Sequence, residues 1–137
     1  MEMKMIPMEK KMITRIEEVF THDFLVDLLS GASYGSEWFI YDVHEDTPDE
    51  VYQAAKERYE CREDIWAYVL TNGGCLSVND WEEDKEYRVT LQDIINGLSI
   101  AMFNYPEQYA NIMLENADFY DYDCVIQCAV FGDLVYG

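Results

Sequence analysis

The C-terminal segment constrains the fold most, because its helical pattern has almost no polar face. A helix that begins around Asp121 would carry the apolar residues Cys124, Val125, Ile126, Cys128, Ala129, Val130, Phe131, Leu134 and Val135. A helix that is apolar on nearly every side is buried, either in the core of its own chain or at a subunit interface. We therefore expect this segment to lie at the centre of the core, and a homodimer formed through it is the alternative.

Capping residues and apolar spacing predict four more helices. The best defined has Thr47 as its cap, Pro48 at the first helical position and a glutamate at the third, which is a capping box. Thr21 and Thr90 are predicted caps of two others, and Pro106 suits the first turn of the fourth. The predicted helices run over residues 21–31, from 47 to about 61, from 90 to about 102, and from 106 to about 116.

Alternating and β-branched runs predict strands at residues 11–19, 38–43, 65–70, 75–78 and 87–89. Asn72-Gly73-Gly74 is typical of a hairpin turn, and consecutive strands joined by short turns favour an antiparallel meander. We therefore predict one α+β domain over residues 1–137. In it, a small antiparallel sheet of about four strands packs against N-terminal and C-terminal helices, and residues 1–10 form a flexible N-terminus.

The charge of the chain excludes several classes of function. Its 137 residues contain 28 Asp and Glu but only 9 Lys and Arg, which gives a net charge of −19. Direct binding to nucleic acid or to an anionic membrane needs a basic surface, which this composition cannot supply. Residues 16–55 and 89–137 hold no Lys or Arg at all, so we expect their carboxylates to lack local partners. Partners must then come from the basic start of the chain, from its middle segment, from water or from another molecule.

The chain shows no sign of a secreted or membrane-spanning protein. Its first residues contain no apolar core of a signal peptide, and no apolar run approaches the roughly 18 to 20 residues of a membrane span. Four cysteines at uneven spacing do not form a disulfide framework. We therefore expect a cytoplasmic protein with reduced thiols.

Three segments of the sequence, Gly74–Leu91, Asp121–Gly137 and Gly31–Trp38, resemble a family of small acidic proteins carried by bacterial conjugative elements and prophages. Gly74–Leu91 is similar to a pattern in that family of a strand, an acidic turn with a lysine, a second strand and a Thr-Leu helix start. Asp121–Gly137 is similar to the family's C-terminus, and Gly31–Trp38 to its Gly-rich segment. The resemblance covers roughly residues 20–137 and departs from the family at Pro106–Asn116. It implies a mobile-element setting but no named reaction.

Residues that could carry chemistry have simpler explanations. Cys124 and Cys128 have a spacing that can hold a metal, but the other possible ligands, such as His22 and His44, are not paired at ligand spacing. The same residues would be needed for a Cys–His nucleophile, and small buried side chains on an apolar helix explain the cysteines better. Carboxylates before or in a first helical turn are explained by the helix dipole. We predict no catalytic residue, no metal and no cofactor.

The preferred hypothesis is a non-enzymatic acidic module that binds a basic protein surface, such as one that normally holds nucleic acid in a host defence or DNA-processing complex. Imitation of DNA would require the acids to gather on one face, because the mean density is one net charge per roughly 390 Å² against about 105 Å² for a duplex. The alternative is a small-ligand or regulatory domain with a pocket between the sheet and the C-terminal helices, with Trp38 and Tyr34 at its mouth. An enzyme is a third possibility. The residues predicted to bind the partner are Tyr34, Trp38, Glu45, Asp46, Asp49, Glu50, Asp80, Trp81, Glu82, Glu83 and Asp84.

Overall fold

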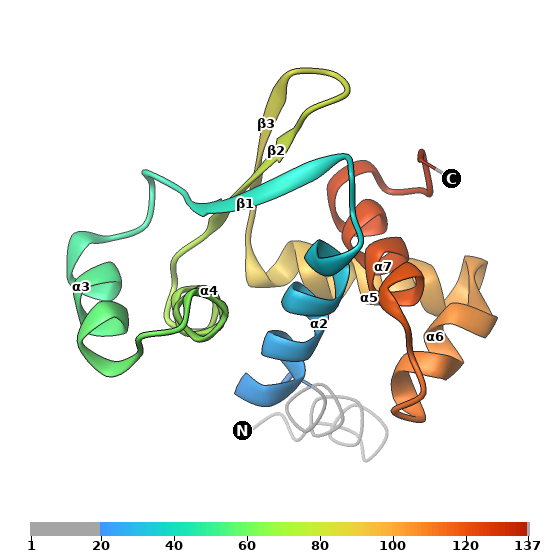
Figure 1. The fold of residues 1–137 in the computed structure, drawn as a ribbon, viewed down its shortest axis with the longest axis horizontal. Coiled ribbons are helices and arrows are strands. Elements are labelled where there is room, and N and C mark those ends of the chain that lie inside the picture. The colour runs from blue at the N-terminus through green and yellow to red at the C-terminus, as the bar shows by residue number, and fades with distance from the viewer. Residues whose placement is uncertain (1–19, 137) are drawn as a thin grey trace, which may run out of the picture.

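A computed structural model describes residues 20–136 and shows one small α+β domain. A three-stranded antiparallel sheet lies across the top of the view in Figure 1, with helices beneath it. The elements are α2 (His22–Tyr34), β1 (Phe39–Val43), α3 (Asp49–Arg58), α4 (Arg62–Thr71), β2 (Leu76–Asp80), β3 (Lys85–Val89), α5 (Leu91–Asn104), α6 (Pro106–Met113) and α7 (Phe119–Phe131). The strand predicted at 11–19 and the flexible N-terminus lie outside the described residues.

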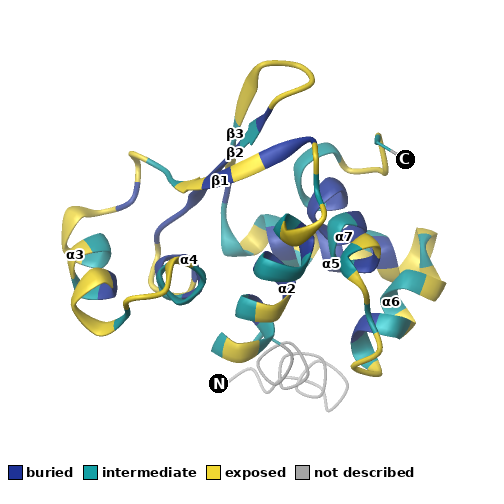
Figure 2. Cartoon of the chain, in the orientation of Figure 1, coloured by how far each residue is buried: buried dark blue, intermediate teal, exposed yellow. Residues whose placement is uncertain are grey.

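The sheet has one buried face and one open face. Its order is β1-β2-β3, and paired residues of neighbouring antiparallel strands lie on the same face. Tyr41 pairs with Val78, which pairs with Tyr87, and this row points toward the helices. The next row, with Asp42 and Arg88, points to solvent. Figure 2 shows the contrast between the buried inner part of the sheet and its exposed hairpin tip.

The terminal helix α7 is the centre of the core, as its pattern predicts. Its residues Cys124–Cys128 are all buried, and α5 and α2 pack against it more extensively than any other pair of helices. Asp118 caps it and forms a capping box with Asp121, so the helix starts two residues before its predicted start. It ends at Gly132, which has a φ of 76°. The last predicted apolar residues, Leu134 and Val135, therefore lie beyond the helix.

The caps of α2 and α5 are confirmed, but the predicted end of α2 is wrong. Thr21 Oγ1 accepts a hydrogen bond from the backbone N–H of Phe24 at 3.2 Å, and Thr90 forms a capping box with Asp93. Gly31, the expected end, lies inside α2, which continues to Tyr34. A Cβ at Gly31 would lie 2.3 Å from the ring of Tyr122. Glycine is therefore used here for close packing against α7 and not for a helix end.

The capping box predicted at Thr47 does not form, although the helix after it does. The Thr47 side chain is buried, and its hydroxyl donates to the carbonyl oxygen of Cys75 at 2.9 Å and accepts from its N–H at 3.0 Å. It therefore joins the loop before α3 to the start of β2. The helix begins at Asp49 and ends at Arg58, three residues before its predicted end. Similarly, α6 starts at Pro106 as predicted but ends at Met113.

The predicted strand at 65–70 is wrong, because these residues belong to α4. A short apolar run cannot distinguish a buried strand from a buried helix by its pattern alone. Glu63 and Asp64 occupy the first turn, where the helix dipole favours negative charge. The predicted hairpin turn is the end of this helix: Gly74 N–H donates to Val69 carbonyl oxygen at 2.8 Å, and Gly73 has a φ of 87°. The described sheet thus has three strands and not about four.

Candidate functional site: an aromatic and acidic corner beside the hairpin turn

The turn between β2 and β3 carries the acids expected to bind a partner. Asp80 is only 2% exposed and builds this turn, since one of its carboxylate oxygens accepts the backbone N–H groups of Glu82 at 2.8 Å and Glu83 at 3.2 Å. Asp84 completes the turn with a φ of 51°. The predicted role of Asp80 in binding is therefore corrected to a structural one. Glu82, Glu83 and Asp84 are exposed, and none of them forms an ion pair within residues 20–136.

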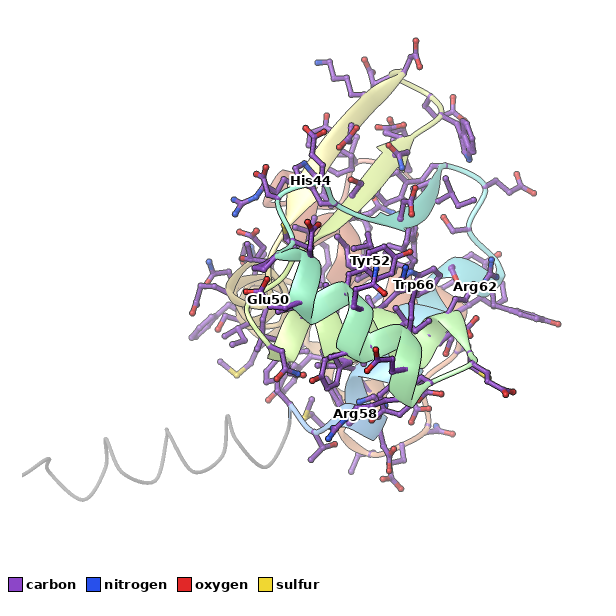
Figure 3. All side chains as sticks on the ribbon, turned by 90° about the vertical axis from the view of Figure 1, so that its left-hand side faces the viewer. His44, Glu50, Tyr52, Arg58, Arg62 and Trp66 are labelled. Atoms are coloured by element: carbon purple, nitrogen blue, oxygen red, sulfur yellow. The ribbon has the colours of Figure 1, made fainter. Side chains whose placement is uncertain are left out.

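Three large apolar side chains beside this turn are exposed. Trp81 is 64% exposed, Tyr34 is 89% exposed and Ile40 is 44% exposed. They border a groove of about 410 Å³ between α2, β1 and the start of α4, which we call the Trp81 groove. The floor includes Trp66, and Figure 3 shows this indole beside Arg62, whose guanidinium carbon lies 5.4 Å from the ring centre. The predicted residues Tyr34, Trp81, Glu82, Glu83 and Asp84 are thus brought to one corner of the molecule.

Trp38 does not belong to the exposed surface. It is 4% exposed and packs against the rings of Phe131 and Tyr136. Its indole N–H donates to Asp123 at 2.7 Å. Burial raises the pKa of Asp123, and its hydrogen bonds from Trp38 and Gln127 lower it in part. Trp38 was predicted to bind a partner, but its indole lies in the core and exposes too little surface for a large contact.

A second hollow, of about 620 Å³, lies next to the Trp81 groove. We call it the Tyr120 hollow, and it is bordered by loop 35–38, the start of α7, Glu82 and Tyr136. The two hollows are neighbours, because Trp81 lines one and Glu82 lines the other. A pocket between the sheet and the C-terminal helices was predicted with both Trp38 and Tyr34 at its mouth. In the structure these two residues line different hollows.

The other predicted acids lie at the opposite end of β1. The last residue of β1 is followed by the acids Glu45, Asp46, Asp49 and Glu50. Trp81 lies at the other end of β1, where its backbone N–H donates to the carbonyl oxygen of Trp38, the residue before the strand. Six residues of extended chain separate the two positions, which is about 20 Å. The predicted acids therefore form two clusters and not one patch.

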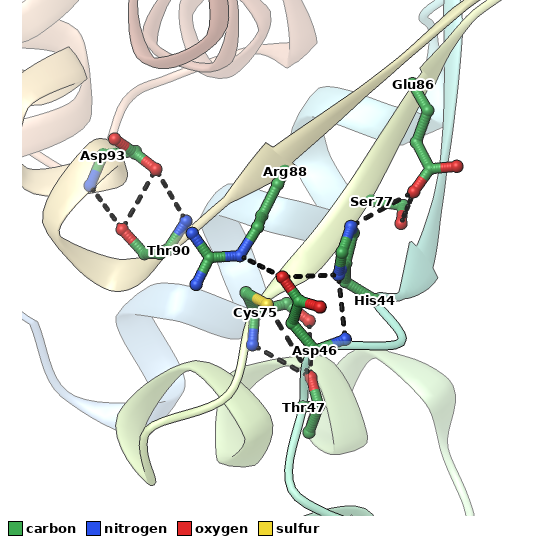
Figure 4. A network of polar contacts seen from close by, with 9 residues as sticks. All are labelled: His44, Asp46, Thr47, Cys75, Ser77, Glu86, Arg88, Thr90 and Asp93. Carbon is green, nitrogen blue, oxygen red and sulfur yellow. Dashed lines mark hydrogen bonds and ion pairs between the residues drawn. The ribbon is translucent and has the colours of Figure 1, made fainter.

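The second cluster is partly neutralised by a polar network on the open face of the sheet (Figure 4). Asp46 pairs with the Arg88 guanidinium at 3.1 Å, and its backbone N–H donates to His44 Nδ1 at 3.0 Å. The other ring nitrogen of His44 lies 3.3 Å from Glu86, which also accepts the Ser77 hydroxyl at 2.9 Å. Ser77 thus donates to a carboxylate and not to the imidazole, so His44 does not activate it in this arrangement.

Acids in the C-terminal cation-free stretch have local partners, contrary to expectation. Of the seven acids in residues 89–137, five accept hydrogen bonds from the protein itself, and these are Asp93, Asp118, Asp121, Asp123 and Asp133. The described Lys and Arg residues lie only on α3, α4 and β3. What distinguishes the turn after β2 is a run of three consecutive exposed acids, Glu82, Glu83 and Asp84, that have no ion-pair partner within residues 20–136.

The cysteines and histidines do not meet at one site. Cys124 and Cys128 are each 2% exposed in the core, and a hydrogen bond to Cys128 together with burial raises the pKa of Cys124. His22 instead bonds to Asp64 at 2.8 Å. Within residues 20–136, no three His, Cys, Asp or Glu side chains are grouped so that they could hold a metal ion.

Tyr136 links the C-terminal segment to the turn and supplies a pH test. Its hydroxyl donates to Asp80 at 2.8 Å. Partial burial, this bond and nearby carboxylates raise the pKa of Tyr136 to about 12 from an ordinary value of 10.0. The folded chain then keeps a proton that the unfolded chain loses, so the contribution of this bond to stability is complete below pH 10 and is lost by about pH 12.

We therefore expect the free energy of unfolding to fall more steeply between about pH 10 and pH 12 in the wild type than in Tyr136→Phe. Urea unfolding at several pH values in this range measures both slopes. Because the other tyrosines titrate equally in both proteins, the difference between the slopes isolates Tyr136. Equal slopes would contradict the assignment.

Sequence reasoning missed the residues that hold this corner together. Gln127 is fully buried and binds the C-terminal segment, and the one signal available was a polar residue within an apolar helix pattern.

Comparison with protein-family models, with curated proteins and with solved structures found no match to this chain. Among the described residues, no helix has the length and apolar character needed to cross a membrane.

Proposed function

We propose that this protein is a non-enzymatic acidic interaction module of a mobile genetic element. It acts in the cytoplasm and binds the basic surface of a partner protein through the corner formed by Tyr34, Ile40, Trp81 and the carboxylates of residues 82–84. The mobile-element setting comes from the resemblance of residues 74–91 and 121–137. A partner that normally holds nucleic acid fits best, because its binding surface is already basic.

The observation that carries this proposal is an exposed indole next to carboxylates that have no ion-pair partner among the described residues. Trp81 exposes 64% of its surface, and exposed tryptophan and tyrosine side chains are the most frequent contributors of binding energy at protein interfaces. The adjacent carboxylates attract a basic surface and speed its association, while the aromatic contacts slow dissociation. Both kinds of group come from one short turn and the end of α2.

The first test uses a fluorescently labelled polyarginine peptide as a model of the basic surface. Any protein of this charge attracts such a peptide, so the informative comparison is between variants. Trp81→Ala is expected to weaken binding by about tenfold or more, because a central aromatic contact is lost. Phe103→Ala removes an aromatic side chain that is 78% exposed elsewhere, and it should bind as the wild type does.

The charges are tested in the same assay. Neutralising Glu82, Glu83 and Asp84 to their amides should weaken binding and flatten its dependence on salt between about 50 mM and about 500 mM. Glu107→Gln with Glu115→Gln is the control pair on α6 and just after it. If the control variants weaken binding as much as the corner variants do, the corner is not the site and the proposal fails.

A further inference from the structure

The Tyr120 hollow has aromatic walls. Tyr120, Phe119, Trp38 and Tyr136 line it, with Tyr120 65% exposed at its edge and Trp38 almost completely buried. Gly35 brings loop 35–38 close to α7, since a Cβ at this position would lie 2.4 Å from the Phe119 ring. The faces of aromatic rings attract a cation through their negative electrostatic potential.

The same hollow is lined by carboxylates. Glu37, Glu82 and Asp123 line it, and no lysine or arginine of the described residues does. Asp123 is held in place by the Trp38 indole N–H at 2.7 Å and by the Gln127 side-chain amide at 2.7 Å. Each of its oxygens keeps a further lone pair for another donor. The hollow is therefore prepared for positive charge on several sides.

An unused hydrogen-bond acceptor gives an independent indication of a ligand. Ser36 and Tyr41 carry the buried hydroxyl groups that have no hydrogen-bond partner within the described part of the chain, and Ser36 lines the Tyr120 hollow. Buried polar groups are nearly always hydrogen-bonded. A ligand with N–H donors that reaches the Ser36 oxygen from the hollow would satisfy it, whereas an apolar ligand would leave it unpaired.

We propose that the Tyr120 hollow receives an arginine side chain of the basic partner, an inference that rests on the proposed function. The guanidinium group is planar, always charged and carries N–H donors in several directions. It can stack on an aromatic wall while it donates to the Asp123 carboxylate and to the Ser36 hydroxyl. A lysine ammonium matches the charge but lacks the planar group that stacks on an aromatic ring.

The test uses a short acetylated Gly-Arg-Gly amide and the same peptide with citrulline, which has the shape of arginine without its charge. The NMR signal of the Trp38 indole N–H reports on the hollow directly, because this group bonds to Asp123. We expect the arginine peptide to shift this signal saturably and the citrulline peptide to leave it in place. Equal shifts with both peptides, or no shift with either, would overturn the proposal.

Substitutions of exposed residues at the edge of the hollow should leave the fold intact, so a loss of peptide binding can be assigned to the hollow. Glu37 and Glu82 are exposed, so the double variant Glu37→Gln with Glu82→Gln should fold normally. Its affinity for the arginine peptide should be lower by roughly threefold to tenfold. Ser36→Ala should weaken it as well, and Glu107→Gln with Glu115→Gln should not. Unchanged affinity in both hollow variants would also overturn the proposal.

Failure of this inference is distinguishable from failure of the proposed function. If polyarginine binding depends on Trp81 and on the acids of the turn but Trp38 does not respond to the arginine peptide, the corner binds basic surfaces without using the hollow. If Trp38 responds and polyarginine binding is insensitive to Trp81, the hollow binds arginine and the proposed function is wrong.

Discussion

Gly97→Val should unfold the protein or lower its free energy of unfolding by about 3 kcal/mol or more. Gly97 lies in α5 where this helix crosses α7, and a Cβ there would lie 2.7 Å from the backbone N of Ala129 and from the backbone O of Val125. Backbone atoms cannot rotate away as a side chain can, so the two helices would have to separate. The α5–α7 contact is the most extensive between two helices of the domain.

Ser99→Val is the matched control, because it places the same side chain on the exposed side of α5. Its effect should stay within about 0.5 kcal/mol. Urea unfolding followed by circular dichroism measures both variants. A Gly97→Val protein as stable as the control would show that α5 and α7 do not approach each other so closely.

Gln127→Leu should lower the free energy of unfolding by roughly 2 to 4 kcal/mol, because it removes four hydrogen bonds from a buried site. The side-chain oxygen accepts the backbone N–H groups of Val135 at 2.8 Å and Tyr136 at 2.7 Å. The side-chain amide donates to Asp123 at 2.7 Å and to the Tyr136 carbonyl oxygen at 3.1 Å. Leucine has a similar size, so the loss comes from the polar contacts.

The same substitution should also release the C-terminal segment. Hydrogen exchange of the Val135 and Tyr136 amides is expected to speed up strongly, since both lose their acceptor. Gln92→Leu is the control: Gln92 is exposed on α5 and its side chain donates to Asn96 alone. Slow exchange of both amides in Gln127→Leu would show that another contact holds the segment.

The fold could be predicted where a local rule and the burial of the element agree. The α7 segment is apolar on most sides and is buried, and Thr21 and Thr90 cap helices as their sequence context predicts. The predictions were wrong where tertiary contacts decide. The apolar run 65–70 is compatible with a strand or a helix, and Thr47 bonds to Cys75, which is 28 residues away.

The candidate site was predictable only in part for a similar reason. Trp81 was among the residues predicted to bind a partner, and the structure shows that it is exposed. Trp38 is a tryptophan like Trp81, and Asp80 is an acid like the residues of the turn, but both are buried. In the core, Trp38 bonds to Asp123 and Asp80 bonds to Tyr136. These partners lie 85 and 56 residues away in the chain, and no local pattern shows such pairs.

The charge distribution also differs from the simplest expectation. Many carboxylates of this chain cap helices or bond to nearby backbone groups, so a large net charge does not by itself create a recognition surface. The surface proposed for recognition is a short turn in which Glu82, Glu83 and Asp84 form no ion pair within residues 20–136 and Trp81 is exposed. This is a narrower surface than a track of charges along a whole face, and it favours recognition of one basic patch over imitation of a long duplex.

The most direct measurement is a map of the residues that a polyarginine peptide touches, from amide NMR spectra recorded during its titration. The account predicts that the largest changes fall on Tyr34, on residues 35–38 and on residues 81–84, and that they decrease in high salt. The other acidic cluster, at residues 45–50, should change much less. Changes centred on residues 45–50, or spread evenly over all acidic residues, would contradict the account.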